Sequence, residues 1–271
     1  MDQVQLATFQ AVIGTGSFEA AARQLHVTPS AVSQRIKALE SSVGQVLVRR
    51  AKPCVATPAG AALVRFAGQV ELLEREALAQ ARDGARVSIV VNADSLDTWF
   101  LPALAAVPGP SYELHTDDQD YTADLLRSGT AMAAVTAEHV AVQGCRLEPL
   151  GAMRYLPVGS GDPGQPMIVY NRKDRLQHRF LESLGREADV PIHYVPATAA
   201  FVEAIRLGLG WGMVPEQRAL PDIAAGRYRQ LISGKYLDVP LYWQYWKIES
   251  AVLKDLTAAV RTAAAGVLRR N

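Results

Sequence analysis

The stretch 17–37, SFEAAARQLHVTPSAVSQRIK, contains two short helical patterns separated by a turn at residues 26–27. In the first pattern, apolar residues recur at the spacing of one helical face: Phe18, Ala21, Ala22 and Leu25. The second pattern begins with Thr28 and Pro29, and proline at the first helical position is a strong start signal. Two short helices joined by a tight turn predict a helix-turn-helix.

The second of these helices has two different faces. One is apolar, with Val32, Ile36 and Leu39. The opposite face carries short polar side chains and a lysine at helical spacing: Ser30, Ser33, Gln34 and Lys37. An ordinary solvated face carries more Glu and Lys, whereas hydroxyls and amides suit base edges and phosphates in a major groove. We therefore predict that this helix binds double-stranded DNA, together with Thr28 and Pro29 at its start and Arg35, which lies off the stripe and is expected to reach a phosphate.

The segments around this motif complete the pattern of a winged DNA-binding domain. A first helix is predicted over about 4–13, and two short strands over 46–50 and 53–56. The tip of this wing is basic, with Arg49, Arg50 and Lys52, and we expect it to contact phosphates. This domain is predicted to span residues 1–57.

The charge distribution agrees with a polyanionic partner. In residues 1–86, Lys and Arg outnumber Asp and Glu by 10 to 7, whereas in 87–271 they are outnumbered by 18 to 20. Between positions 23 and 52 the bases are accompanied by a single acid, Glu40. Such a local excess is typical of a nucleic-acid-binding surface.

A long helix is predicted after Thr57, within a linker over 58–84. Its apolar residues follow alternating steps of three and four, the spacing of a coiled-coil seam: Leu63, Phe66, Val70, Leu73 and Ala77. We interpret these residues as a dimerisation seam, because such a helix has little else to bury its stripe against. The alternative is a helix that lies on its own domain.

The remainder, 85–271, alternates strands and helices and predicts an open α/β sheet. Strands are expected over 86–92, 112–116, 131–136, 167–170, 192–195, 211–214 and 241–246. Helices are expected over 96–106, 121–128, 175–187, 199–207 and 251–268. Sheets of this type bind small molecules at the carboxyl ends of their strands.

Several classes of protein are disfavoured. The N-terminus lacks the pattern of a secretory signal, and no apolar run is long enough to cross a bilayer, so we expect a cytoplasmic protein without a membrane partner. Cys54 and Cys145 are expected to be free thiols. The five histidines show no metal spacing, and no nucleophile with a base is evident, so we expect no metal, no cofactor and no enzymatic activity. The glycines of 208–212 follow a helix and precede a strand, the reverse of a nucleotide-binding loop.

The chain resembles the LysR-type transcriptional regulators. The resemblance depends on a dense set of residues in the first domain, in particular Gly16-Ser17-Phe18, Ala20-Ala21-Ala22, Leu25, Thr28-Pro29-Ser30-Ala31-Val32-Ser33, Ile36, Leu39-Glu40, Gly44, Leu47, Arg49 and Thr57-Pro58-Ala59-Gly60. Further residues are similar to the ArgP/LysG branch, which controls export of basic amino acids: Val91-Asn92-Ala93-Asp94-Ser95, Thr98-Trp99-Phe100, Ala134-Val135-Thr136, Gly208-Leu209-Gly210-Trp211-Gly212-Met213 and Leu241-Tyr242-Trp243.

The resemblance implies a C-terminal domain of two periplasmic-binding-protein-like lobes with an effector between them. It also implies dimers that pair into tetramers. The effector class that it implies is lysine or arginine, and the target is an exporter gene. A contact with RNA polymerase is left open. Two departures lie in the second lobe. The stretch between Val158 and Met167 is shorter than is usual in the branch, and Ala199 stands where the branch usually has Glu.

Candidate effector contacts follow the predicted strands or start the predicted helices. They are Asp94, Ser95, Asp97, Trp99, Asp118 with its neighbours Asp117 and Asp120, Thr136 and Thr198. Helix N-termini with Ser95 and Thr198 would bind a carboxylate, and the aspartates would bind ammonium groups. Alternatively, Asp94, Ser95 and Thr198 are helix caps and the cluster at 117–120 is a solvated turn.

Three functions remain to be compared. The leading hypothesis is a ligand-responsive transcriptional regulator. The second is a DNA-binding protein of architectural or replication-inhibiting type that senses no ligand. The third, a solute-binding protein or an enzyme, lacks an export signal and a catalytic set of residues.

Overall fold

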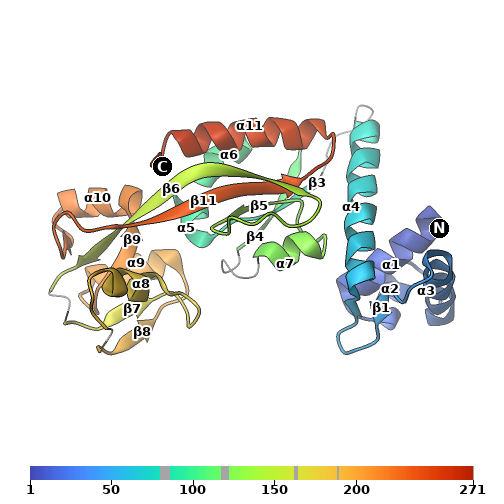
Figure 1. The fold of residues 1–271 in the computed structure, drawn as a ribbon, viewed down its shortest axis with the longest axis horizontal. Coiled ribbons are helices and arrows are strands. Elements are labelled where there is room, and N and C mark those ends of the chain that lie inside the picture. The colour runs from blue at the N-terminus through green and yellow to red at the C-terminus, as the bar shows by residue number, and fades with distance from the viewer. Residues whose placement is uncertain (80–85, 117–121, 162–163, 188, 271) are drawn as a thin grey trace.

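The computed structural model describes residues 1–79, 86–116, 122–161, 164–187 and 189–270. The first domain is the predicted winged helix-turn-helix (Figure 1). Its elements are α1 (Gln3–Thr15), α2 (Phe18–Gln24), α3 (Pro29–Val43), β1 (Val48–Arg49) and β2 (Val55–Ala56). The two strands pair antiparallel, as expected for the wing.

The core of this domain forms where the apolar faces of the three helices meet. Phe9 of α1 and the predicted apolar stripe of α3, Val32, Ile36 and Leu39, are fully or almost fully buried in one cluster. Gly16 ends α1 in the left-handed conformation with a φ of 67°, which glycine adopts without steric cost. The hydrophobic pattern of the sequence therefore determined this core directly.

The long helix α4 (Pro58–Ala79) uses two faces. The stripe predicted as a seam is only partly covered: Phe66 and Leu73 are 43% and 41% exposed, and Leu63 and Val70 are half-buried. Ala77 belongs to the helix, but its side chain is outside the described residues. A second face, with Gly68 and Leu72, is buried within the chain itself.

This second face contacts the C-terminal domain. The indole of Trp246 covers α4 at Gly68, where a Cβ would lie 2.8 Å from the ring. Leu72 belongs to the main core of that domain, and Arg65 donates a 2.8 Å hydrogen bond to the carbonyl of Arg127. The sequence interpretation that α4 has little else to bury against was therefore incomplete, because a glycine lets the helix approach a tryptophan closely.

The C-terminal domain has two lobes joined by long strands (Figure 1). Lobe one contains β3 (Arg86–Val90), α5 (Ala93–Ser95), the π-helix η1 (Leu96–Phe100), α6 (Leu101–Ala105), β4 (Ser111–His115), α7 (Thr122–Arg127), β5 (Ala133–Thr136) and α11 (Ala251–Ala265). Lobe two contains β7 (Met167–Val169), α8 (Leu176–Ser183), β8 (Ile192–Tyr194), α9 (Thr198–Arg206), β9 (Gly212–Pro215), α10 (Glu216–Ala224) and β10 (Arg229–Gln230). The long strands are β6 (Cys145–Gly159) and β11 (Leu237–Trp246).

The main sheet is mixed rather than wholly parallel. Its strand order is β10-β6-β11-β5-β3-β4, with β9 also paired to β6. Strand β3 is parallel to β4 and β5, whereas β6 and β11 are antiparallel to each other and pass from one lobe to the other. The fold class predicted from the sequence is confirmed.

The sequence analysis missed three elements and misplaced several ends. Strand β6 was not predicted at all, and neither were α10 and β10. Pro149, Gly151 and Pro157 lie inside β6 and are typical of turns, so its sequence does not look like a strand. Cys54 and Cys145 are free thiols, as predicted. Within the described ranges, no helix combines the length and apolar character needed to cross a membrane.

Candidate functional site

The exposed face of α3 is the first candidate site. Ser30, Gln34 and Lys37 are exposed and Ser33 is half-buried, so the predicted stripe is on the surface. The hydroxyl of Thr28 accepts a 3.2 Å hydrogen bond from the amide of Ala31 and lies 2.9 Å from the Ser30 hydroxyl. The start of the helix is thereby closed by its own N-cap, while the stripe beyond it remains open to a partner.

The basic wing lies beside this helix and holds its cations outward. Arg49, Arg50 and Lys52 are exposed, and the Arg50 guanidinium stacks 4.7 Å from the centre of the Phe18 ring. The carboxylate of Glu40 accepts the amides of Leu47 and Val48 at 2.8 and 3.2 Å. The only acid of the 23–52 stretch is therefore engaged in holding the wing.

Arg35 differs from the other predicted DNA contacts. It is half-buried, and its guanidinium lies 3.4 Å from the hydroxyl of Thr8 on α1. This placement turns Arg35 toward the inside of the domain, away from the stripe of Ser30, Gln34 and Lys37. The structure therefore gives no support to a direct DNA contact by Arg35.

The second candidate site is a cavity of about 500 Å³ between the two lobes. Lobe one contributes residues that follow β3 and β4, and lobe two contributes α8, α9, α10 and the loop after β7. The charged and polar residues of its wall are Asn92, Asp94, Thr116, Tyr155, Tyr170, Asn171, Lys173, Asp174, Arg175, Gln177, Arg179, Thr198 and Arg218. Strands β3 and β4, which Asn92 and Thr116 follow, end at the cavity, as expected for ligand sites in α/β sheets.

Carboxylates dominate one part of this wall. Burial, together with the smaller effect of the negative charges of Asp174 and Asp97, raises the pKa of Asp94 to about 6. The hydroxyl of Tyr155 donates a 2.8 Å hydrogen bond to Asp94 and opposes this shift. A partly buried carboxylate with acidic neighbours stabilises a bound cation, which would relieve the mutual repulsion.

The loop between β7 and α8 places the second cavity carboxylate. The Asp174 side chain accepts hydrogen bonds from the amides of Tyr170 and Leu176 at 3.1 and 2.9 Å, which fixes its position. Nearby, Gln177 donates to the carbonyl of Ile168 at 2.8 Å, while its own carbonyl oxygen is buried without a hydrogen-bond partner. Buried polar atoms are normally paired, so this oxygen is available to a donor on a ligand.

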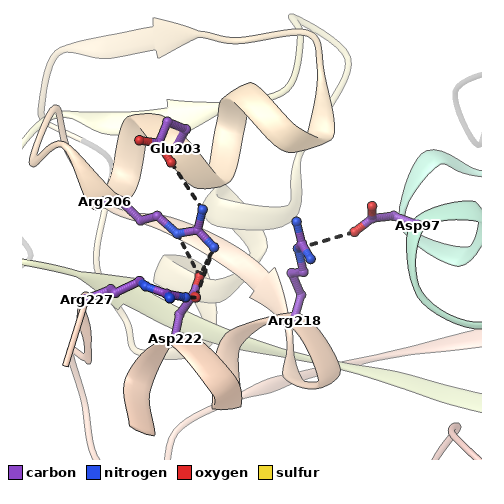
Figure 2. Close-up of polar contacts among 6 residues, drawn as sticks. All are labelled: Asp97, Glu203, Arg206, Arg218, Asp222 and Arg227. Carbon is purple, nitrogen blue, oxygen red and sulfur yellow. Dashed lines mark hydrogen bonds and ion pairs between the residues drawn. The ribbon is translucent and has the colours of Figure 1, made fainter. Parts of the chain in front are cut away.

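Cations are present on the same wall. Lys173, Arg175, Arg179 and Arg218 all line the cavity. Arg218, on α10, approaches Asp97 of lobe one at 3.6 Å (Figure 2). A cavity with both carboxylates and guanidinium groups suits a ligand that carries a carboxylate and positive charge together.

The structure separates the predicted effector contacts into groups. Asp94 and Thr198 line the cavity. Ser95 is fully buried next to Asp94, with a hydroxyl that has no hydrogen-bond partner, and Asp97 reaches the cavity edge through its contact with Arg218. The predicted contacts at Asp117, Asp118 and Asp120 lie outside the described residues.

Like Ser95 and Asp97, the predicted contacts Trp99 and Thr136 are not among the residues that line the cavity. The ring of Trp99 is 1% exposed and packs edge-on against Phe100 in the core of lobe one. Thr136 is buried, and its hydroxyl accepts the amide of Glu138. Both residues were predicted because they lie at or after the end of a strand. The Trp99 side chain instead packs in the core, and the Thr136 side chain stabilises a turn.

The sequence analysis predicted Asp94 and Thr198 but missed the other polar and charged wall residues, among them Tyr155, Asp174, Gln177 and Arg218. A signal existed for Asp174, because the polar run 171–174 directly follows a predicted strand, as Asp94 does. No signal existed for Tyr155 and Arg218, since neither β6 nor α10 was predicted.

Comparison with protein-family models assigns both domains. Residues 4–61 match the model described as bacterial regulatory helix-turn-helix protein, lysR family. Residues 80–265 match the model described as LysR substrate binding domain. The first match contains the winged helix-turn-helix, and the second contains both lobes and the cavity.

Comparison with known proteins finds similar chains of nearly the same length. The HTH-type transcriptional regulator LysG of Mycobacterium tuberculosis is 47% identical, over 99% of this chain and 95% of the relative. The lysine export transcriptional regulatory protein LysG of Corynebacterium efficiens is 44% identical, over 99% of this chain and 100% of the relative.

Two solved structures extend the similarity to the fold. The crystal structure of ArgP from Mycobacterium tuberculosis superimposes with a TM-score of 0.90 at 46% identity and covers 100% of both chains. Full-length LysG from Corynebacterium glutamicum with bound effector Arg superimposes with a TM-score of 0.83 at 40% identity, over 99% of this chain and 100% of that one.

Proposed function

Since this chain belongs to the LysR family of bacterial regulatory helix-turn-helix proteins, we propose that it regulates transcription of an exporter gene in response to a basic amino acid. The first domain binds promoter DNA, and the cavity between the lobes binds the effector. The observation that carries the proposal is the cavity wall, where Asp94 and Asp174 lie with Arg218 and other cations around one volume of about 500 Å³. Because its partner is DNA, we place the protein in the cytoplasm.

The DNA-binding part of the proposal rests on the exposed face of α3. Ser30, Ser33, Gln34 and Lys37 present hydroxyl, amide and ammonium groups, and the wing adds three exposed cations. We assign base contacts to the stripe and phosphate contacts to the wing, because amides read base edges whereas arginine and lysine neutralise the backbone. We leave Arg35 out of the set because it contacts Thr8.

The effector part rests on charge. Arginine and lysine carry an α-carboxylate and two cationic groups, and the wall offers carboxylates for the cations and guanidinium groups for the carboxylate. The relatives named LysG include a lysine export regulator and a structure with bound effector Arg. The departures at Ala199 and in the short stretch after Val158 lie in lobe two.

Thermal unfolding of the full-length protein in the presence of each of the twenty amino acids tests this proposal. We expect the midpoint to rise with arginine or lysine, because a ligand that binds only the native state stabilises it. Agreement requires a smaller or absent shift with the neutral and acidic amino acids. If none of the twenty amino acids shifts the midpoint, the result would contradict the proposed sensor and favour a DNA-binding protein that senses no ligand.

We further propose that α4 forms the dimer. Of its predicted stripe, Leu63 packs against the core of the first domain, whereas Phe66 and Leu73 are 43% and 41% exposed. The face with Gly68 and Leu72 is already used. Two copies that pair along this stripe would place two α3 helices on one DNA duplex. Size-exclusion chromatography of F66E/L73E should show a smaller species than the wild type, and an unchanged size would contradict the seam. Pairing into tetramers and a contact with RNA polymerase stay predictions.

A further inference from the structure

Two arginines of lobe two, Arg206 and Arg218, have different surroundings (Figure 2). Arg206 of α9 donates to the carboxylate of Asp222 at 2.7 to 2.9 Å and to Glu203 at 3.1 Å. The Asp222 side chain is only 3% exposed and is bonded by Arg227 as well. Arg206 is therefore fully engaged and ties α9 to α10.

Arg218 has a single long contact. Its Nε lies 3.6 Å from Oδ2 of Asp97, beyond the range of a good hydrogen bond, and the two side chains are 42% and 30% exposed. Among the described residues no other hydrogen bond or ion pair involves its guanidinium, although Arg218 lines the cavity. Asp97 belongs to lobe one and Arg218 to lobe two, so this weak pair spans the cleft (Figure 2).

We propose that Arg218 binds the carboxylate of the effector and releases Asp97 when it does so. This inference rests on the proposed function, because it names one binding residue of the same cavity and the residue that competes for it. A guanidinium fork matches a carboxylate in a bidentate geometry, which is stronger than a single exposed contact at 3.6 Å. The exchange replaces a poor partner with a better one.

The backbone around Arg218 is held in place for such an exchange. The carboxylate of Glu216 accepts two hydrogen bonds from Arg269, at 2.6 and 3.1 Å. The side chain of Gln217 donates a 3.0 Å hydrogen bond to the carbonyl of Val267. The two residues before Arg218 thus anchor the first turn of α10 to Val267 and Arg269. Only the Arg218 side chain needs to move.

The exchange changes what connects the two lobes. Without effector, the pair Asp97–Arg218 connects lobe one to lobe two across the cavity. With effector, Asp94 of lobe one binds a cationic group and Arg218 of lobe two binds the carboxylate, so the ligand itself becomes the connection. Asp97 is then free to face the cation, since its charge already acts on Asp94.

Calorimetric titration of the full-length protein with L-arginine and with agmatine tests this inference. Agmatine keeps the guanidinium of arginine but lacks the carboxylate, so the ratio of the two affinities isolates carboxylate recognition. R218Q should lower the arginine affinity about 10-fold or more, toward that of agmatine, and leave agmatine within about twofold of the wild type. D97N should raise the arginine-to-agmatine ratio, because it removes the competing carboxylate.

E203Q is the matched control. Glu203 is an exposed partner of Arg206 in the same lobe and does not line the cavity. The arginine-to-agmatine affinity ratio of E203Q should therefore equal that of the wild type. Circular dichroism checks that each variant is folded. An arginine-to-agmatine ratio in R218Q equal to that of the wild type would overturn the inference while leaving the proposed function intact. If the wild type binds neither arginine nor lysine, the proposed function fails and this inference fails with it.

Discussion

The polar face of α3 and the interlobe cavity are built from the sequence in different ways. The exposed stripe of α3 comes from one helix between Ser30 and Lys37, whereas the cavity takes side chains from Asn92 to Arg218. A stripe on one helix follows from its 3.6-residue period alone. A cavity requires several strands and helices to be placed first. Changes to the first site should therefore be local in effect, whereas changes to the second should alter charge, stability and ligand binding together.

The largest effect is expected for the reading face. S33A/Q34A removes a hydroxyl and an amide from the exposed side of α3, and specific base contacts are worth about 1–3 kcal/mol each, so specific affinity should fall about 100-fold. Binding to unrelated duplexes, which depends on phosphate contacts, should stay the same. Footprinting and fluorescence anisotropy at fixed salt measure both.

Q143A is the control for this change. Gln143 is an exposed glutamine in the C-terminal domain, outside both candidate sites. Its footprint should equal that of the wild type. A footprint retained by S33A/Q34A would show that the exposed face of α3 does not read the DNA sequence.

The next largest effect concerns Asp94. D94N removes the cavity carboxylate bonded by Tyr155, and the loss of a charge-assisted contact should lower arginine affinity about 30-fold. In the wild type the same affinity should fall as the pH is lowered through about 6, because Asp94 then becomes protonated. Calorimetric titration at pH 5.0 and 7.5 measures both, and Q143A again provides the unaltered reference.

Asp94 should also affect the stability of the protein without effector. Its pKa is raised from 3.8 to about 6, so between these values the native state holds a proton that the unfolded chain has released. Stability therefore falls as the pH rises through this window, by up to about 3 kcal/mol. D94N should lack this fall and be the more stable protein at pH 7. Equal pH dependence in urea unfolding of D94N and wild type would contradict the raised pKa.

A smaller effect is expected where α4 joins the two regions. Alanine normally stabilises a helix relative to glycine by about 1 kcal/mol. G68A should instead destabilise by about 1–2 kcal/mol, because the added Cβ would lie 2.8 Å from the Trp246 ring. Urea unfolding followed by tryptophan fluorescence measures the change.

G14A is the matched control for G68A. Gly14 is also helical, in α1, but a Cβ there would meet nothing within 4 Å. G14A should therefore be neutral or stabilising. If G68A is as stable as G14A, α4 does not pack on Trp246, and the helix contacts the C-terminal domain less closely than the structure indicates.

The smallest effect is expected in the wing. K52A removes one exposed cation at the wing tip, so affinity should fall a fewfold for every duplex sequence alike. The slope of log affinity against log salt should decrease by about 0.9, the value for one phosphate contact. A loss restricted to one duplex sequence would instead assign Lys52 to base reading.

The fold could be predicted from the sequence wherever local periodicity is strong. The helices of the first domain, the wing and the parallel strands of lobe one were placed correctly to within a few residues. Strand β6 could not be predicted, because Pro149, Gly151 and Pro157 resemble a loop until β11, β9 and β10 pair with it. Gly151 illustrates the reason: its φ of 123° and its close approach to the carbonyl of Arg269 exist only in the folded chain.

The candidate sites divide in the same way. The sequence predicted the α3 stripe, and for the cavity it predicted Asp94 and Thr198 because each stands at the end of a strand or the start of a helix. It also predicted Trp99, whose indole packs in the core. Position in an element was visible in the sequence, but the direction of the side chain was not.

The sequence by itself determined the winged helix-turn-helix, its exposed polar stripe and the alternation of strands and helices that follows. These features depend on residues three or four apart, or adjacent along a strand, so they are encoded locally. Only the tertiary structure decided that Tyr155, Asp174 and Arg218 share one cavity and that α4 packs on Trp246 through Gly68. Those contacts join residues far apart in the chain, so no local periodicity of the sequence predicts them.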